Sequence, residues 1–179
     1  MNHIRAGAVA LTLAGGLLVG CSHAKTLPAP SSNVAAATLH DASGAALGDV
    51  TLTENYAGIL VAGSLTGLAP GTHAIHIHAV GKCEPPFQTA GGHFNPDAKK
   101  HGFNSAAGWH MGDLPNIDVP ASGAVKFELL MPGGRLSGPD GVLDADGAAV
   151  VIHASRDDYM TDPAGGAGAR VACGVIAAR

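Results

Sequence analysis

The amino-acid sequence predicts an all-β domain, an antiparallel sandwich or barrel with long loops. Several segments alternate apolar and polar residues with a period of two, which is the repeat of a strand with one buried face. Glycine and proline, 26 and 11 of the 179 residues, punctuate these segments throughout. No long stretch keeps a helical period, and we find no internal repeat.

The first residues are typical of an export signal. Met1 to Arg5 is short and basic, and residues 6–20 form a run of small apolar side chains that is too short to span a bilayer comfortably. The run ends in Leu18-Val19-Gly20-Cys21, which resembles the lipobox of bacterial lipoproteins, where the cysteine becomes the lipidated first residue. An ordinary signal peptide with an incidental cysteine is the alternative. We predict a signal peptide over residues 1–20 and a membrane-anchored lipoprotein of the bacterial periplasm or cell envelope.

Residues 21–36 are mostly small or polar, with Pro28 and Pro30, and are interpreted as the lipidated cysteine and a flexible tether. Residues 37–179 suffice for one domain with a substantial core. Loss of Arg5 with the signal lowers Lys and Arg from 10 to 9 against 14 Asp and Glu, so the formal charge becomes −5. This balance disfavours nucleic acid as a partner.

Four apolar segments of the domain are predicted to be strands. The clearest runs from Val125 to Leu129, where three apolar residues alternate with a lysine and a glutamate. The others are residues 50–53, 57–65 and 171–176. Residues 81–116 do not fit this pattern, because they lack periodicity and are rich in Gly, Pro, Asn and Lys. Such a long loop needs a function or a constraint in a compact domain, and metal binding could order it.

Histidines gather in and beside this loop. His76 and His78 lie two apart in a predicted strand, so they share one face, while Ile75 and Ile77 point into the core. His73 falls on the isoleucine face and is predicted to be a hydrogen-bonded structural histidine. Imidazole is the commonest protein ligand for zinc and copper.

Further candidate ligands follow along the chain: His93, His101, His110, Asp113 and, at the end of the apolar run 148–152, His153. Two four-coordinate sites need about eight ligand positions. Six histidines and one aspartate suffice if one histidine bridges the metals through both ring nitrogens. A single zinc site with scattered surface histidines is the alternative, and spacing alone leaves both open.

The chain has three cysteines, Cys21, Cys83 and Cys173. If Cys21 carries lipid, an even pair remains, as is expected in an oxidising compartment. A bond between Cys83 and Cys173 would stabilise the fold by roughly 4–5 kcal/mol by chain-entropy reasoning. Two buried free thiols are the alternative.

Seven segments, in order and well spaced over about residues 37–179, resemble the copper/zinc superoxide dismutase family. They are His76-Ile77-His78, Gly91-Gly92-His93-Phe94-Asn95-Pro96, Lys100-His101-Gly102, His110-Met111-Gly112-Asp113-Leu114, Val151-Ile152-His153, Asp157-Asp158 and the run from Gly168 to Ile176. The resemblance implies a Greek-key β-sandwich or flattened barrel with long metal-binding loops. It also implies dismutation of superoxide to oxygen and hydrogen peroxide, with a redox-cycling copper and a structural zinc.

The resemblance also implies a role for each site residue. The implied copper ligands are His76, His78, His93 and His153, and the implied zinc ligands are His93, His101, His110 and Asp113. His93 would be the bridge and a carrier of a proton, and Arg170 would guide superoxide to copper. Asp157 would link His76 and His101, fixing their ring orientation. Cys83 and Cys173 match the family disulfide. The alternatives are a surface ion pair for Arg170 and a solvated loop carboxylate for Asp157.

The chain departs from the family at Ala74-Ile75, at Trp109, and in the lysine-free loop from Tyr159 to Arg170. None of these changes replaces a ligand. A non-catalytic copper- and zinc-binding module on the same fold is the main alternative function. A zinc hydrolase would need an open zinc position and a general base, which four zinc ligands would not leave. The oligomeric state is left open, with a homodimer among the expectations.

Overall fold

The computed structural model describes Met1 and residues 34–179. The predicted signal peptide, Cys21 and most of the predicted tether lie outside the described residues. Within them, strands are joined by loops and by one 3-10 turn, η1 (Gln88–Ala90), which confirms the predicted all-β class. None of the described residues forms a helix with the length and apolarity needed to cross a bilayer.

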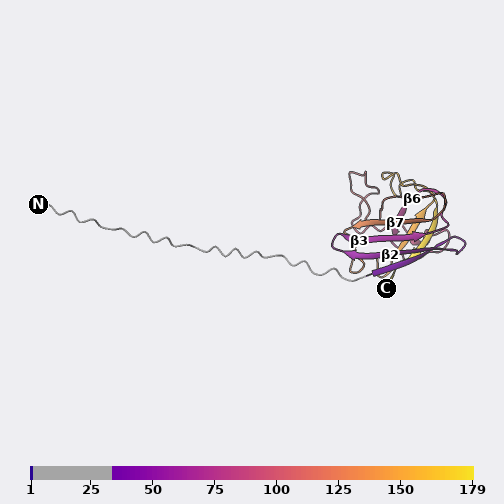
Figure 1. Ribbon diagram of the computed structural model, residues 1–179, viewed down its shortest axis with the longest axis horizontal. Coiled ribbons are helices and arrows are strands. Elements are labelled where there is room, and N and C mark those ends of the chain that lie inside the picture. The colour runs from indigo at the N-terminus through magenta and orange to yellow at the C-terminus, as the bar shows by residue number, and fades with distance from the viewer. Residues whose placement is uncertain (2–33) are drawn as a thin grey trace.

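Eight strands form one curled antiparallel sheet, in which β2, β3 and β7 run side by side (Figure 1). In spatial order the strands are β5 (Ile75–His78), β8 (Ala149–His153), β9 (Arg170–Val175), β1 (Val34–Asp41), β2 (Ala46–Asn55), β3 (Gly58–Leu65) and β7 (Val125–Pro132), with β10 (Ala177–Ala178) paired to β1. The strands β4 (Gly71–His73) and β6 (Ile117–Val119) form a second, small sheet. The late strands β8 and β9 lie between β5 and β1, so the connections cross over as in Greek-key folds.

The predicted strand segments lie in β2, β3, β7 and β9. The start of the domain differs from the expected boundary, because β1 begins at Val34 and residues 34–36 belong to it rather than to the tether. Ala35 is buried and pairs with Leu52 of β2 and Ala178 of β10. The small side chains of residues 34–36 show no alternation of apolar and polar residues, so this pairing left no trace in the hydropathy pattern.

The strand β8 is buried on both faces. Val150 and Ile152 belong to the main core, whereas Ala149 and Val151 pack in a second cluster with Phe87, Ala90 and Cys173. The alternating residues of one strand therefore contact two different layers. The second layer is the beginning of the long loop, which covers the outer face of β8 and β9.

Two anchors hold this loop on the sheet. Cys83 is joined to Cys173 of β9 by a disulfide with a Cα–Cα distance of 5.6 Å, which confirms the predicted pairing. Phe87 is 1% exposed although its backbone is left-handed, with φ of 69°. That conformation costs a non-glycine residue about 1–2 kcal/mol, less than the roughly 3–5 kcal/mol by which a buried Phe side chain exceeds Ala in stability. Burial of the ring therefore decides the conformation.

Candidate metal centre

The strand β5 is the base on which the centre is built. His76 and His78 share the face opposite Ile75 and Ile77, as the two-residue spacing predicts. That face is not open to solvent, because both histidines are 0% exposed beneath the loop. The partner strand β8 ends in His153, which is also buried.

Backbone hydrogen bonds dock the ligand loop onto β5. The amide of Ile77 donates to the carbonyl of Gly112 at 2.9 Å, and the amide of Phe94 donates to the carbonyl of Ile77 at 2.8 Å. Gly112 closes the set by donating to the carbonyl of Phe94 at 2.8 Å. A Cβ on Gly112 would collide with the Ile77 carbonyl oxygen. Glycine is therefore required between His110 and Asp113 for the loop to approach the strand.

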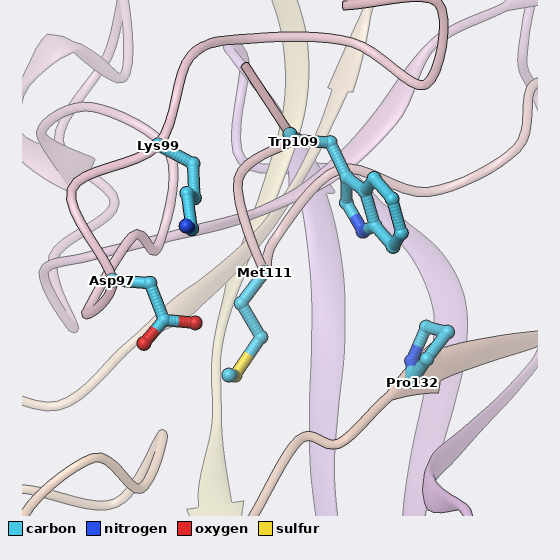
Figure 2. Close-up of a pocket in the computed structure, with 6 residues that line it drawn as sticks. Asp97, Lys99, Trp109, Met111 and Pro132 are labelled. Atoms are coloured by element: carbon cyan, nitrogen blue, oxygen red, sulfur yellow. The ribbon is translucent and has the colours of Figure 1, made fainter. Parts of the chain in front are cut away.

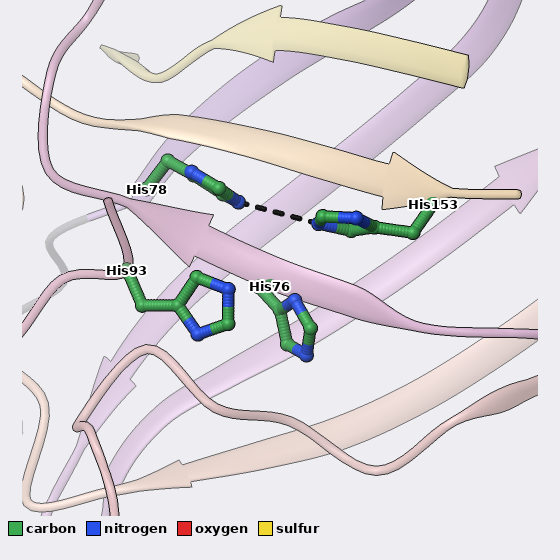
Figure 3. Close-up of side chains that lie close together, drawn as sticks. All are labelled: His76, His78, His93 and His153. Atoms are coloured by element: carbon green, nitrogen blue, oxygen red, sulfur yellow. Dashed lines mark hydrogen bonds between the residues drawn. The ribbon is translucent and has the colours of Figure 1, made fainter. Parts of the chain in front are cut away.

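These contacts bring the seven candidate ligands into two groups. Within each group, one nitrogen or oxygen atom from each residue lies within 4.8 Å of the others, and every member is buried. Figure 3 shows the first group, with His78 and His153 pointing toward one another and their Nε2 atoms 3.4 Å apart. The first group is His76, His78, His93 and His153, and the second is His93, His101, His110 and Asp113.

His93 belongs to both groups. Its Nδ1 lies 2.7 Å from Oδ1 of Asp113 and 3.4 Å from Nδ1 of His110, on the side of the second group. Its Nε2 is buried and has no hydrogen-bond partner among the described residues. The same holds for Nδ1 of His76 in the first group. A buried polar atom left unpaired costs about 1–3 kcal/mol, so these two nitrogens mark a place for a ligand.

The Asp157 carboxylate connects the two groups from behind. Its Oδ2 accepts a hydrogen bond from Nε2 of His76 at 2.8 Å, and its Oδ1 accepts one from Nε2 of His101 at 2.9 Å. The Asp157 side chain is almost fully buried, so it is not a solvated loop carboxylate. Each bond places a proton on Nε2 and so makes Nδ1 of the same ring the nitrogen that would bind a metal.

The Asp113 carboxylate is held in place by the loop itself. Its Oδ2 accepts hydrogen bonds from the amides of Gly102 at 2.8 Å and His110 at 3.0 Å. Its Oδ1 faces Nδ1 of His93 at 2.7 Å, of His101 at 3.1 Å and of His110 at 3.3 Å. One oxygen and three nitrogens thus converge on the same point.

Backbone carbonyls orient the remaining rings of the first group. Nδ1 of His78 donates to the carbonyl of Gly91 at 2.9 Å, and Nδ1 of His153 lies 3.3 Å from the carbonyl of Gly168. Both rings therefore turn Nε2 toward the group.

His73 stays outside both groups, as predicted. Its ring nitrogens lie 2.7 Å from the carbonyl of His153 and 2.8 Å from that of Ala69.

Burial tunes the pKa values of the first group. It lowers the pKa of His78 to about 2, that of His153 to about 3 and that of His93 to about 4, with further lowering from neighbouring histidines. These rings are therefore neutral near pH 7, which is the form that binds metals. Burial also acts to lower the pKa of His101, but hydrogen bonds to Asp113 and Asp157 outweigh it and raise the pKa to about 9.

The two carboxylates behave in the opposite way. Burial alone would raise the pKa of Asp113 and Asp157. Burial is the largest single influence, but hydrogen bonds from His101, from a second histidine and from a backbone amide together outweigh it and hold both pKa values well below the usual range. Both groups therefore stay anionic beside the candidate ligand atoms.

The donor sets fit copper and zinc. Four imidazoles suit copper, and three imidazoles with a carboxylate suit zinc. A bound structural metal contributes about 10–16 kcal/mol in small zinc domains, far more than two unpaired nitrogens cost. The burial of so many polar side chains at one place is therefore explained by metal binding.

Arg170 lies beside the first group. It begins β9, where it pairs with His153 of β8. Its guanidinium donates to the carbonyl of Phe87 at 2.7 Å and to that of Gly91 at 2.6 Å. Its charge contributes to lowering the pKa of both His78 and His153. Arg170 is thus held by backbone carbonyls rather than by a surface ion pair.

Sequence reasoning missed two residues that support Asp157. The Asn116 side chain donates to the Asp157 carbonyl at 3.0 Å and accepts from the Asp157 amide at 2.8 Å. The amide of Asn116 in turn donates to the Tyr159 hydroxyl at 2.7 Å. An asparagine close after a predicted ligand was the available signal, but its partner lies 41 residues away in the chain.

Trp109 precedes His110 but turns away from the ligands. Its side chain is at the surface, 43% exposed, and its ring meets Phe103 edge-on at 5.9 Å. It lines a pocket of about 170 Å³ together with Lys99, Met111 and Pro132 (Figure 2). None of the seven candidate ligands lines this pocket. This departure from the family pattern therefore leaves the second group uncrowded.

An antiparallel Greek-key sheet with two buried ligand groups that share one imidazole defines a class of proteins with paired metal ions. Residues 46–176 match the family model described as copper/zinc superoxide dismutase (SODC). The chain belongs to this family, and the metals of the family are copper and zinc.

Individual relatives agree. The chain is 41% identical over 169 residues to superoxide dismutase [Cu-Zn] 2 of Aquifex aeolicus, covering 92% of this chain and 95% of that protein. It is 46% identical over 147 residues to superoxide dismutase [Cu-Zn] of Caulobacter vibrioides, covering 79% and 84%. It is also similar to the crystal structure of a double mutant of a SOD-like protein from Bacillus subtilis, with a TM-score of 0.77, 41% identity, and coverage of 81% and 98%.

We expect Gly112→Ala to weaken zinc binding about 10–100-fold, the range typical of lost support around a metal ligand. The new Cβ meets the Ile77 carbonyl and pushes the loop from β5. Competition titration with a zinc-sensitive dye measures the affinity. Gly92→Ala is the control, because a Cβ there meets nothing within 4 Å. Equal zinc affinity for Gly112→Ala and parent would contradict the docking role of Gly112.

Proposed function

We propose that this chain removes superoxide as a copper/zinc superoxide dismutase, converting two superoxide anions into oxygen and hydrogen peroxide. One observation carries the proposal: two complete, buried ligand groups share His93, and a fixed arginine lies beside the first. Relatives that cover most of this chain are named as enzymes of this activity.

We assign copper to the first group and zinc to the second. The copper ligands are His76, His78, His93 and His153, and the zinc ligands are His93, His101, His110 and Asp113. When bound, copper supplies one-electron redox chemistry, and zinc, which has no accessible redox change, supplies a fixed charge that orders the loop. Asp157 supports both sets by orienting the rings of His76 and His101.

The remaining roles belong to residues of the chain. Arg170 attracts and orients the small anion with a positive charge that two carbonyls hold in place. His93 can hold a proton at Nε2 when that atom is not engaged by metal, and so can supply it to the reduced substrate. The buried rings of the first group limit the access of bulk water.

A non-catalytic metal-binding module is the alternative. A missing copper ligand or a missing Arg170 would have favoured such a protein, and the chain lacks neither. Arg170 is partly buried and both of its carbonyl contacts are short, so its positive charge is held beside the first group, which supports a role in attracting an anionic substrate. The geometry therefore favours the enzyme.

The copper assignment predicts that His153→Ala abolishes superoxide removal while the fold persists, because the strands and the disulfide remain. The rate is measured by pulse radiolysis on protein loaded with copper and zinc, with metal content and circular dichroism recorded for each variant. His40→Ala, which changes an exposed histidine outside both groups, is the control. Full activity in His153→Ala would remove His153 from the copper site.

The assignment of Arg170 predicts a salt-dependent effect. Arg170→Ala should lower the superoxide rate markedly with both metals bound, and Arg170→Glu should lower it further by reversing the local field. The difference from the parent should shrink with salt, since the Debye length falls from about 10 Å at 0.1 M to about 3 Å at 1 M. A loss that survives at high salt would report hydrogen bonding to the anion. Equal rates for all three proteins would exclude Arg170 from the site.

We also propose a lipid anchor at Cys21 and a location in the bacterial periplasm or cell envelope. The lipobox-like ending of the short apolar run supports this proposal. Cys21→Ser should move the protein from the membrane fraction to the soluble fraction of expressing bacteria at unchanged specific activity. Identical fractionation of parent and variant would contradict it.

A homodimer also stays a prediction, which sedimentation of the metal-loaded protein would check.

A further inference from the structure

We propose that Phe87 is a positioning residue for Arg170. This proposal rests on the role of Arg170 proposed above. Its buried ring fixes the backbone carbonyl that accepts one arm of the guanidinium. Phe87 belongs to neither metal ligand group, and no feature of the sequence marked it.

The two acceptors of Arg170 bracket the 3-10 turn η1. Phe87 precedes the turn and Gly91 follows it. Nη1 of Arg170 donates to the first carbonyl and Nη2 to the second. The guanidinium plane is therefore defined by both ends of η1, and any rotation of the turn also rotates the guanidinium.

The direction of the Phe87 carbonyl is set by an uncommon backbone conformation. Phe87 has φ of 69° and ψ of 16°, a left-handed region that L side chains other than Asn, Asp and His seldom adopt. Contacts made by the Phe87 side chain must therefore stabilise this backbone conformation. The ring provides them, because it is 1% exposed and packs with Ala90, Ala149, Val151 and Cys173.

This packing joins the turn to the strand that carries the arginine. Cys173 and Arg170 both lie in β9, and Ala149 and Val151 lie in the neighbouring β8. The ring thus packs between η1 and two strands, β9, which begins at Arg170, and β8, which ends at His153. The disulfide at Cys83 also tethers the loop to β9. It lies upstream of Phe87, however, and joins the strand at Cys83 rather than at Phe87, whose own amide donates to the carbonyl of Glu84 at 2.6 Å.

The same turn reaches a proposed copper ligand. The Gly91 carbonyl accepts from both Nη2 of Arg170 and Nδ1 of His78. A displaced η1 would therefore disturb the guanidinium at two points and the ring of His78 at one. The Phe87 carbonyl accepts from the guanidinium and from the Ala90 amide of the turn but from no proposed copper ligand, so loosening it should affect anion attraction before it affects copper.

The test combines the variants Phe87→Leu and Phe87→Ala with Arg170→Ala. The guanidinium is observed directly by NMR of ¹⁵N-labelled arginine in the diamagnetic copper(I)/zinc protein, with Arg170→Ala identifying the signal. Superoxide rates at low salt, metal content and unfolding midpoints are recorded for every variant. Leu52→Ala, a core truncation on β2, two strands from β9, controls for lost stability.

We expect Phe87→Ala to lower the rate about tenfold, the lower end of what a local field contributes to association, with both metals retained. Resolved, slowly exchanging Nη signals of Arg170 in the parent should become averaged, and Phe87→Leu should be intermediate. The double variant Phe87→Ala/Arg170→Ala should match Arg170→Ala alone within about twofold, because both changes act through one guanidinium. Leu52→Ala should lower only the unfolding midpoint.

Parent-like Arg170 signals in Phe87→Ala, or rate losses that multiply in the double variant, would overturn the positioning role. If Phe87→Ala does not fold, Phe87→Leu decides in the same way: partial averaging supports the role and unchanged signals refute it. If Arg170→Ala itself keeps the parent rate, the proposed role of Arg170 fails instead, whatever the signals show.

Discussion

The shared imidazole of His93 is the constraint on which the rest of the structure depends. Its two nitrogens face different ligand groups, so the loop that carries His93 must lie at a fixed distance from β5 and β8. Three contacts hold the loop at that distance: the disulfide, the buried Phe87 ring and the hydrogen bond between Gly112 and Ile77. The sheet supplies rigidity, and the loop supplies most of the chemistry.

Charge balance is the second requirement of the buried centre. Asp113 and Asp157 remain anionic inside the protein because each contacts His101 and another ring of the centre. Isolated buried carboxylates would be protonated instead. Two carboxylates among the imidazoles make the interior favourable for cations, and the guanidinium of Arg170 holds a positive charge beside the first group.

Much of the architecture was predictable because hydropathy repeats directly report which faces are buried. The alternation in residues 125–129 identified β7, and the spacing of His76 and His78 placed both on one face of β5. The pattern could not show that this face is covered, because its cover is a loop brought in by long-range contacts. The start of β1 at Val34 was hidden for a related reason, since alanines fit a strand or a tether equally well.

The candidate ligands were predictable as side chains, but their supports were not. The acceptors that orient His78, His153 and Arg170 are backbone carbonyls, which every residue has and no sequence pattern marks. Asn116 carries a recognisable amide, but its partner Asp157 is distant in the chain. Resemblance to a family conveys the ligands residue by residue, whereas the hydrogen bonds behind them depend on the folded chain.

Because Asp157 bonds to one ring in each group, the two sites cannot be filled independently. A cation that fixes His101 also restrains the carboxylate that orients His76, and the shared ring of His93 adds a second connection. Repulsion between the two cations opposes this mutual support of the two sites. Whatever the net sign, thermodynamic linkage requires reciprocity: the factor by which zinc changes the affinity for copper equals the factor by which copper changes the affinity for zinc. The order of filling in a cell is therefore set by the supply of the two ions as well as by their separate affinities.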